Sequence, residues 1–135
     1  MNKHIALGIV IAIVVQLMLL AGFDFVAGSQ NRFNGTFLFL ALQSSTISLL
    51  SIAAGAYVAR SGFFPSAIAI WLVEWLAIIY ILVLIDDGRH DQFAVALTVA
   101  KLNWLGIISS LLFTFVGVKL GHLARAKFSA APATI

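Results

Sequence analysis

Residues 66–85 read SAIAIWLVEWLAIIYILVLI and contain a single charged residue, Glu74. A helix of this length spans about 30 Å, which is about the thickness of the hydrocarbon core of a bilayer. No polar face is left for water along most of the segment. The segment therefore predicts a transmembrane helix.

The composition of the whole chain agrees with this prediction. Of its 135 residues, 62% are hydrophobic and 10% are charged, and the mean hydropathy is +1.09. Soluble domains carry roughly 25% charged residues. We therefore predict an all-α integral membrane four-helix bundle with up-down-up-down order, formed by one domain. Its predicted spans are residues 5–23, 37–58, 66–85 and 97–119, its domain is residues 1–123, and a disordered tail follows at residues 124–135.

The first apolar run also resembles the core of a secretory signal, because it follows a short basic start and precedes the small residues of segment 27–29. Signal cores are about 7–15 residues long. The run of about 19 residues is long enough to cross a bilayer, so we expect a retained helix.

The positive charges predict the orientation, because Lys and Arg near span ends stay on the cytoplasmic side. The predicted spans divide the basic residues unequally between the two sides. One side holds Lys3, Arg60, Lys119, Arg125 and Lys127. The other side holds Arg32 and Arg89, with Lys101 near its edge. We therefore expect a multi-pass protein of a cell membrane, the bacterial inner membrane in our interpretation, with both termini cytoplasmic. The basic residues form no patch along the sequence, so nucleic acid is not an expected partner.

Glu74 is the one acid predicted deep in the membrane, about 12 Å of helix rise from either end of its span. A charged side chain at that depth costs roughly 3 kcal/mol, so Glu74 should face other helices, find partners or stay protonated. Trp71 shares its helix face and is a candidate hydrogen-bond donor. Other polar residues predicted at similar depth or as polar lining are Gln16, Ser48, Ser109, Ser110 and Asn103.

Small residues recur at helical spacing in two of the predicted spans and indicate faces where helices approach closely. The second span carries Ser44, Ser48, Ser51 and Gly55. The fourth carries Gly106, Ser110, Thr114, Gly117 and Gly121. A shorter set, Gly8, Ala12 and Gln16, lies in the first span.

Lys101 leaves two interpretations open. Counting back from Lys119 places it near the outer boundary, where its stem reaches the headgroups. The alternative is a buried partner of a carboxylate.

Catalytic and metal motifs are weak. Asp86, Asp87, His90 and Asp91 offer metal ligands within six residues, but a solvated loop explains them better. No histidine is predicted near the mid-membrane serines, which argues against a hydrolase. The sequence therefore predicts no catalytic residue, metal or cofactor.

Two functions remain. The leading interpretation is a non-enzymatic accessory or structural subunit that packs against itself or a larger membrane complex within the lipid bilayer. The alternative is a small proton-coupled transporter or channel component that uses Glu74.

Overall fold

The computed structural model describes residues 2–27, 37–85 and 91–129, with side chains from 2–22, 43–85 and 91–129. These residues form five α-helices and no strand, which confirms the all-α prediction. The helices are α1 (Lys3–Ala27), α2 (Phe37–Ala59), α3 (Phe64–Ile85), α4 (Gln92–Leu102) and α5 (Trp104–Ser129).

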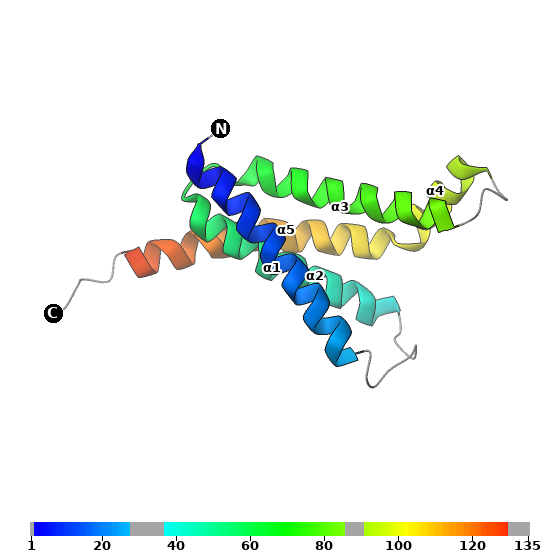
Figure 1. Ribbon diagram of the computed structural model, residues 1–135, viewed down its shortest axis with the longest axis horizontal. Helices are drawn as coiled ribbons and strands as arrows, with labels where there is room; N and C mark the ends of the chain where they lie inside the picture. The colour runs from blue at the N-terminus through cyan, green and yellow to red at the C-terminus, as the bar shows by residue number, and fades with distance from the viewer. Residues whose placement is uncertain (1, 28–36, 86–90, 130–135) are drawn as a thin grey trace.

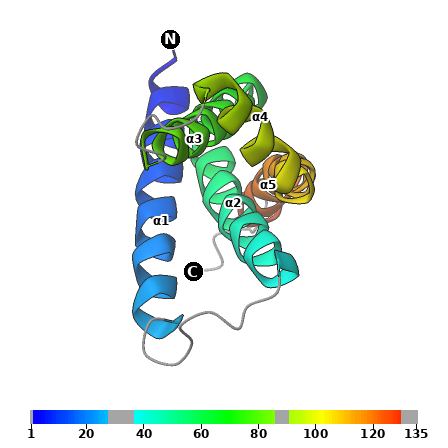
Figure 2. The ribbon, with the colours of Figure 1, turned by 90° about the vertical axis from the view of Figure 1, so that its right-hand side faces the viewer.

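Helix α2 is the centre of the packing. It lies between α1 and α5, and its most extensive contacts are with these two helices (Figure 2). Helix α3 runs beside α5, and α4 lies at the far end of α3 (Figure 1). The start of α1, the connection between α2 and α3, and the last turns of α5 all lie toward the left of Figure 1. The C-terminal ends of α1 and α3 lie toward the right.

Two glycines set the crossing of α1 and α2. A Cβ on Gly8 would lie 2.6 Å from the carbonyl oxygen of Gly55, and a Cβ on Gly55 would lie 2.7 Å from that of Gly8. No other residue type fits such an approach without moving a backbone. Small residues thus let these helices gain contact area by close backbone packing.

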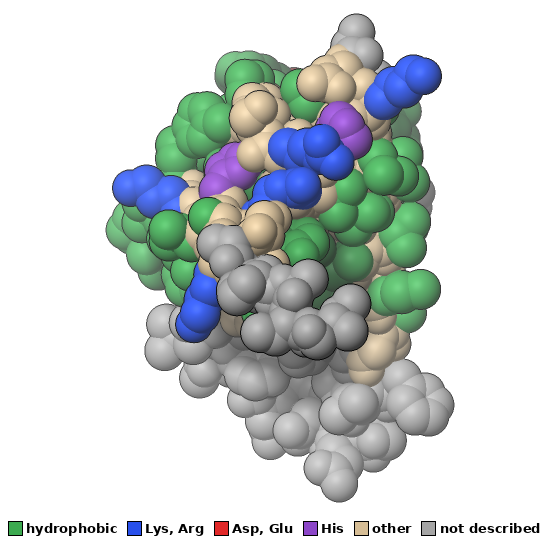
Figure 3. All heavy atoms as spheres, turned by 90° about the vertical axis from the view of Figure 1, so that its left-hand side faces the viewer, with side chains coloured by type: hydrophobic (Ala, Val, Ile, Leu, Met, Phe, Trp, Pro, Cys, Tyr) green, Lys and Arg blue, Asp and Glu red, His purple; other side chains and the backbone are tan. Residues whose placement is uncertain are grey.

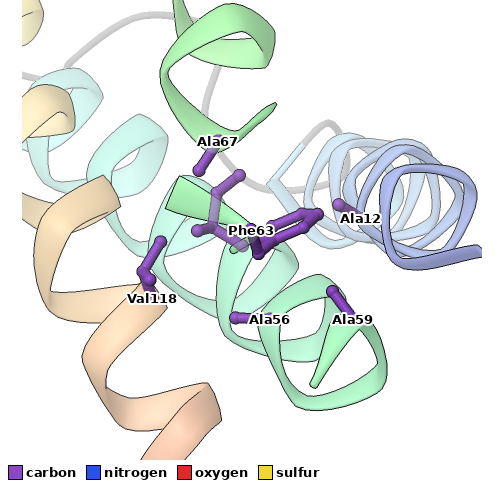
Figure 4. Packing of buried hydrophobic residues seen from close by; sticks show 7 residues of the cluster. Ala12, Ala56, Ala59, Phe63, Ala67 and Val118 are labelled. Atoms are coloured by element: carbon purple, nitrogen blue, oxygen red, sulfur yellow. The ribbon is translucent and has the colours of Figure 1, made fainter. Parts of the chain in front are cut away.

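The contact between α2 and α5 follows the same rule. A Cβ on Gly117 would lie 2.8 Å from the carbonyl oxygen of Leu49, and one on Gly121 would meet that of Ala53. The buried apolar cluster at the centre is correspondingly rich in alanine, and Phe63 is its largest side chain (Figure 4).

The fourth apolar run is divided, which differs from the single span predicted at residues 97–119. Helix α4 ends at Leu102 and α5 begins at Trp104. At Asn103, the backbone N–H and the side-chain amide both donate to the carbonyl oxygen of Val99, at 3.0 and 2.8 Å. The backbone bond has ordinary α-helical spacing, whereas the side-chain amide competes for the same carbonyl oxygen, an effect that hydropathy does not record.

The C-terminal boundary also differs from the prediction. Helix α5 continues to Ser129, whereas the tail was predicted to begin at Ala124. Arg125 explains part of the extension, since its guanidinium donates to the carbonyl oxygen of Tyr57 at 2.8 Å and ties this part of α5 to α2. Residues 130–135 of the predicted tail lie outside the described residues.

Within the described residues, three helices are long and apolar enough to cross a membrane: Lys3–Gly22, Phe64–Ile85 and Trp104–Ser129. Apart from lysines toward the helix ends, their outward side chains are mostly apolar, as in Met18, Val73 and Leu123, which are 69%, 64% and 65% exposed. A contiguous apolar exterior of this kind indicates a lipid-facing surface. Helix α4 has 11 residues, too few to span.

Candidate functional site

A polar contact joins α3 to α5 inside the bundle. Trp71 and Trp75 lie one turn apart on α3, and both indole N–H groups donate to the hydroxyl oxygen of Ser110, each at 3.0 Å. The Ser110 hydroxyl in turn donates to the carbonyl oxygen of Ile107 at 3.1 Å. A serine hydroxyl offers one donor and two acceptor positions, so all three are used.

A second contact beside it joins α2 to α5. The Ser45 hydroxyl donates to the Ser109 hydroxyl at 2.9 Å, and Ser109 donates to the carbonyl oxygen of Gly106 at 3.2 Å. Gly106 itself lies against the Trp75 ring, since a Cβ there would be 3.3 Å from Cη2. Ser109 and Ser110 therefore lie together in a hydrogen-bonded layer that connects α2, α3 and α5.

Sequence reasoning missed Ser45, which is fully buried. It assigned the small residues of this helix to one stripe, although α2 packs on two sides. Ser45 lies one residue, about 100° of helix rotation, from the stripe position Ser44. Ser45, Ile52 and Ala56 recur at spacings of seven and four and are all buried, so this helical spacing was the available signal of a second packed face.

Glu74 is half-buried on the α3 face that also carries Ala67 and Ile70. Ala67 is fully buried, but the next residues on this face, Ile78 and Ile81, are 42% and 54% exposed. The carboxyl group therefore lies where the packed half of α3 gives way to an open half.

The partner considered for Glu74 is not observed. Trp71 donates to Ser110, because its indole N–H points toward α5 and not along its own helix. In the part of the chain that the structure describes, Glu74 has no hydrogen-bond or ion-pair partner. Glu74 is the one ionisable side chain of the predicted layer, and its carboxyl oxygens are not among the fully buried polar atoms of the described residues.

The other predicted polar residues are divided between two places. Gln16 and Ser48 are buried, at 8% and 6% exposure, on the α1 and α2 faces that carry Ala12 and Ser51. Ser51 donates to the carbonyl oxygen of Ser48 at 3.2 Å. Asn103 lies at the junction of α4 and α5 and is bonded to Val99, so it does not join the layer.

The predicted helix-packing residues lie mostly inside the chain. Gly55 faces α1, while Gly117 and Gly121 face α2. Thr114 is fully buried and donates to the carbonyl oxygen of Ser110 at 2.8 Å. Ser44 is half-buried, and Ser51 is fully buried. The small-residue stripes are thus used largely for contacts between helices of one chain.

Two charged residues of the described chain lie at the ends of α4. Lys101 is exposed in the last turn of α4. Asp91 caps α4 by accepting the backbone N–H of Phe93 at 3.1 Å. Asp86, Asp87 and His90, the other members of the metal-ligand candidate, lie outside the described residues.

The chemistry open to this arrangement is that of a single carboxyl group. Glu74 can accept a hydrogen bond, pair with a cation or exchange a proton with a group that approaches from the open half. Among the described residues, no group of three His, Asp or Glu side chains is arranged to hold a metal ion. What this site can do therefore depends on which donor, cation or proton carrier approaches the Glu74 carboxyl group.

Comparison with known proteins gives no further identification: the chain matches no protein-family model, no curated protein and no solved structure.

Proposed function

We propose that this protein is a non-enzymatic accessory or structural subunit that binds a second copy of itself or a larger membrane complex through the Glu74 face of α3. The face consists of Glu74, Ile78 and Ile81. The observation that carries the proposal is Glu74 itself, which is half-buried and unpartnered within the described residues.

The free-energy cost of an unpaired carboxylate supports the binding of another helix to this face. An unpaired carboxylate near the bilayer centre costs several kcal/mol, and a hydrogen-bond donor from another transmembrane helix would reduce this cost. Glycines that often mediate association, such as Gly55 and Gly117, already contact helices of the same chain. Glu74 and the exposed isoleucines beyond it are therefore the better candidate for an intermolecular contact.

The proposal includes a membrane topology. Helix α2 has 23 residues and no charged side chain in its sequence, so we propose it as a fourth span. Both termini are then on one side, and the excess of Lys and Arg there favours the cytoplasm. The bacterial inner membrane is the proposed location.

Cysteine cross-linking tests the contact, and the absence of native cysteine makes the readout clean. Ile81→Cys on the Glu74 face should form disulfide-linked or heterobifunctionally cross-linked species in membranes. Leu72→Cys is the matched control, because Leu72 lies about 180° around α3 from Ile81 and is similarly exposed, at 49% against 54%. Equal cross-linking at both positions, or none at Ile81, would contradict the proposed face.

Substitution of Glu74 tests the role of the carboxyl group. Glu74→Leu should weaken association by about threefold to twentyfold, since an interhelical hydrogen bond in a membrane contributes about 0.6 and at most about 1.7 kcal/mol. Glu74→Gln retains hydrogen bonding and should preserve most of the association. Native mass spectrometry of both variants gives the comparison.

A proton-coupled transporter or channel component is the second candidate, because the same carboxyl group borders the open half of the molecule. In that case Glu74→Gln should abolish proton-coupled flux in proteoliposomes, while insertion and assembly persist. Unchanged flux in this variant, or no flux in the parent protein across a panel of cationic substrates, excludes this candidate.

A further inference from the structure

Five of the eight Lys and Arg residues belong to one end of the molecule, although they come from three separate segments. We call this set the basic end. Its members are Lys3 at the start of α1, Arg60 after α2, and Lys119, Arg125 and Lys127 in the last turns of α5. Figure 3 shows Lys, Arg and His side chains gathered on this end, with no acidic side chain of the described residues among them.

Contacts between the helices bring these segments together. A Cβ on Gly62 would lie 3.8 Å from the Ile5 side chain, which places the start of α1 beside the connection after α2. Arg125 donates to the carbonyl oxygen of Tyr57 at 2.8 Å, and its guanidinium carbon lies 5.9 Å from the centre of the Tyr57 ring. The last turns of α5 are thereby fixed at the same end.

The charges of the basic end are not neutralised within the described part of the chain. Lys3, Arg60, Lys119 and Lys127 are exposed, and none of the five cations has an acidic partner there. Because like charges gathered at one end repel one another, the arrangement favours an external anion.

The surroundings of these charges fit a lipid better than a free anion. Along α5, the cations alternate with exposed apolar side chains: Leu120, Leu123 and Phe128. Tyr57 adds an aromatic ring of the kind that is enriched at the membrane interface. A ligand that meets this surface must be both anionic and apolar.

We propose that the basic end binds the phosphate groups of anionic phospholipids in the adjoining leaflet. Lys3, Arg60, Lys119 and Lys127 contact the headgroups, Arg125 holds α5 in place, and the acyl chains lie against the apolar side chains of α5. This proposal rests on the membrane-spanning part of the proposed function and is independent of Glu74.

The test uses the full-length protein in phosphatidylcholine vesicles that contain a trace of spin-labelled phosphatidylglycerol or spin-labelled phosphatidylcholine. The motionally restricted fraction is measured for each spin-labelled lipid. The ratio of the phosphatidylglycerol fraction to the phosphatidylcholine fraction gives the relative affinity for the anionic lipid. The parent protein should prefer phosphatidylglycerol. Lys119→Gln and Lys127→Gln should each lower that preference by about fivefold, since one basic residue at a membrane surface contributes about 1 kcal/mol. Both side chains are exposed, so folding should be unaffected.

Lys101→Gln is the matched control, because Lys101 is an exposed lysine on α4, outside the basic end. An equal loss in this variant, or no preference in the parent protein, overturns the proposal. Inorganic phosphate, compared with chloride at equal ionic strength, separates the two sources of the anion. If phosphate, but not chloride, abolishes the preference for phosphatidylglycerol, the basic end is a site for free anions, and this result also overturns the lipid proposal. Failure to reconstitute at all would instead count against the membrane-spanning part of the proposed function.

Discussion

At the scale of single residues, Ser110 and Glu74 show opposite outcomes for polar groups at comparable depth. Ser110 accepts two indole N–H groups and donates to Ile107, so its hydroxyl is saturated. Glu74 is one residue from Trp75, yet it has no partner in the described part of the chain. A polar group in hydrocarbon persists when hydrogen-bond partners offset its desolvation, and we propose that the partner of Glu74 is another transmembrane helix.

Replacing Ser110 with alanine should destabilise the protein by about 1 kcal/mol, because two buried indole donors lose their acceptor at about 0.6 kcal/mol each. Unfolding in mixed micelles, followed by tryptophan fluorescence, measures the change. Ser61→Ala, at an exposed serine in the connection after α2, is the control. Equal stability of the two variants would show that the Ser110 contacts contribute nothing.

The sequence predicted the types of residue in the polar layer better than their partners. Ser109 and Ser110 were predicted from depth alone to share a layer with Glu74, but their side-chain partners on other helices are Ser45 and the two tryptophans of α3. Trp71 was a candidate donor to Glu74 and donates to Ser110 instead, because hydrogen-bond direction depends on how α3 is rotated against α5. Periodicity fixes which residues share a face, but it does not fix which helix that face meets.

At the scale of helices, small residues determine which pairs pack closely. Helix α2 uses Gly55 toward α1, and it meets Gly117 and Gly121 of α5 on another side. It therefore holds two neighbours through backbone contacts, whereas α3 holds α5 mainly through tryptophan side chains. This difference explains why α1, α2 and α5 form the tight part of the bundle.

Gly8→Ala should destabilise the contact between α1 and α2 by about 1–3 kcal/mol, the usual cost of overpacking. The added Cβ would lie 2.8 Å from the Cβ of Ala59 as well as against the Gly55 backbone. Gly22→Ala in the same helix is the matched control, because a Cβ there meets nothing within 4 Å. Thermal unfolding in detergent should show the loss for Gly8 only, because alanine is a better helix former than glycine and has room at position 22. A similar loss at Gly22 would show that the close contact at Gly8 is not the cause.

The division of the fourth apolar run was the main element that sequence reasoning did not find. The existence of an apolar run is a matter of composition, and hydropathy predicted it well. The break coincides with the side-chain hydrogen bond from Asn103 to the carbonyl oxygen of Val99 and with a non-helical backbone at Asn103, where φ is −103° and ψ is 11°. Asn103 was instead interpreted as polar lining, since its side chain could not be assigned to its own backbone without coordinates.

At the scale of the whole molecule, the packing is closed at one end and open at the other. The basic end collects α1, the α2–α3 connection and the last turns of α5, while α1 and α3 diverge toward their C-terminal ends (Figure 1). Glu74 lies at the transition between these halves. The basic end and the Glu74 face of α3 therefore lie on different parts of the molecule.

The central claim is that the long helices cross a bilayer in alternating directions, and labelling from each side of the membrane tests it most directly. Variants with a single cysteine are treated with a membrane-impermeant maleimide in right-side-out and in inverted vesicles. The cysteine replaces Ser61, Ser129, Gln92, Val73 in mid-α3, or Asn34 in the link before α2. We expect Ser61→Cys and Ser129→Cys to react only from the cytoplasmic side. Asn34→Cys and Gln92→Cys should react only from the opposite side, and Val73→Cys only after detergent is added. Reaction of all these cysteines from a single side in intact vesicles would contradict the account.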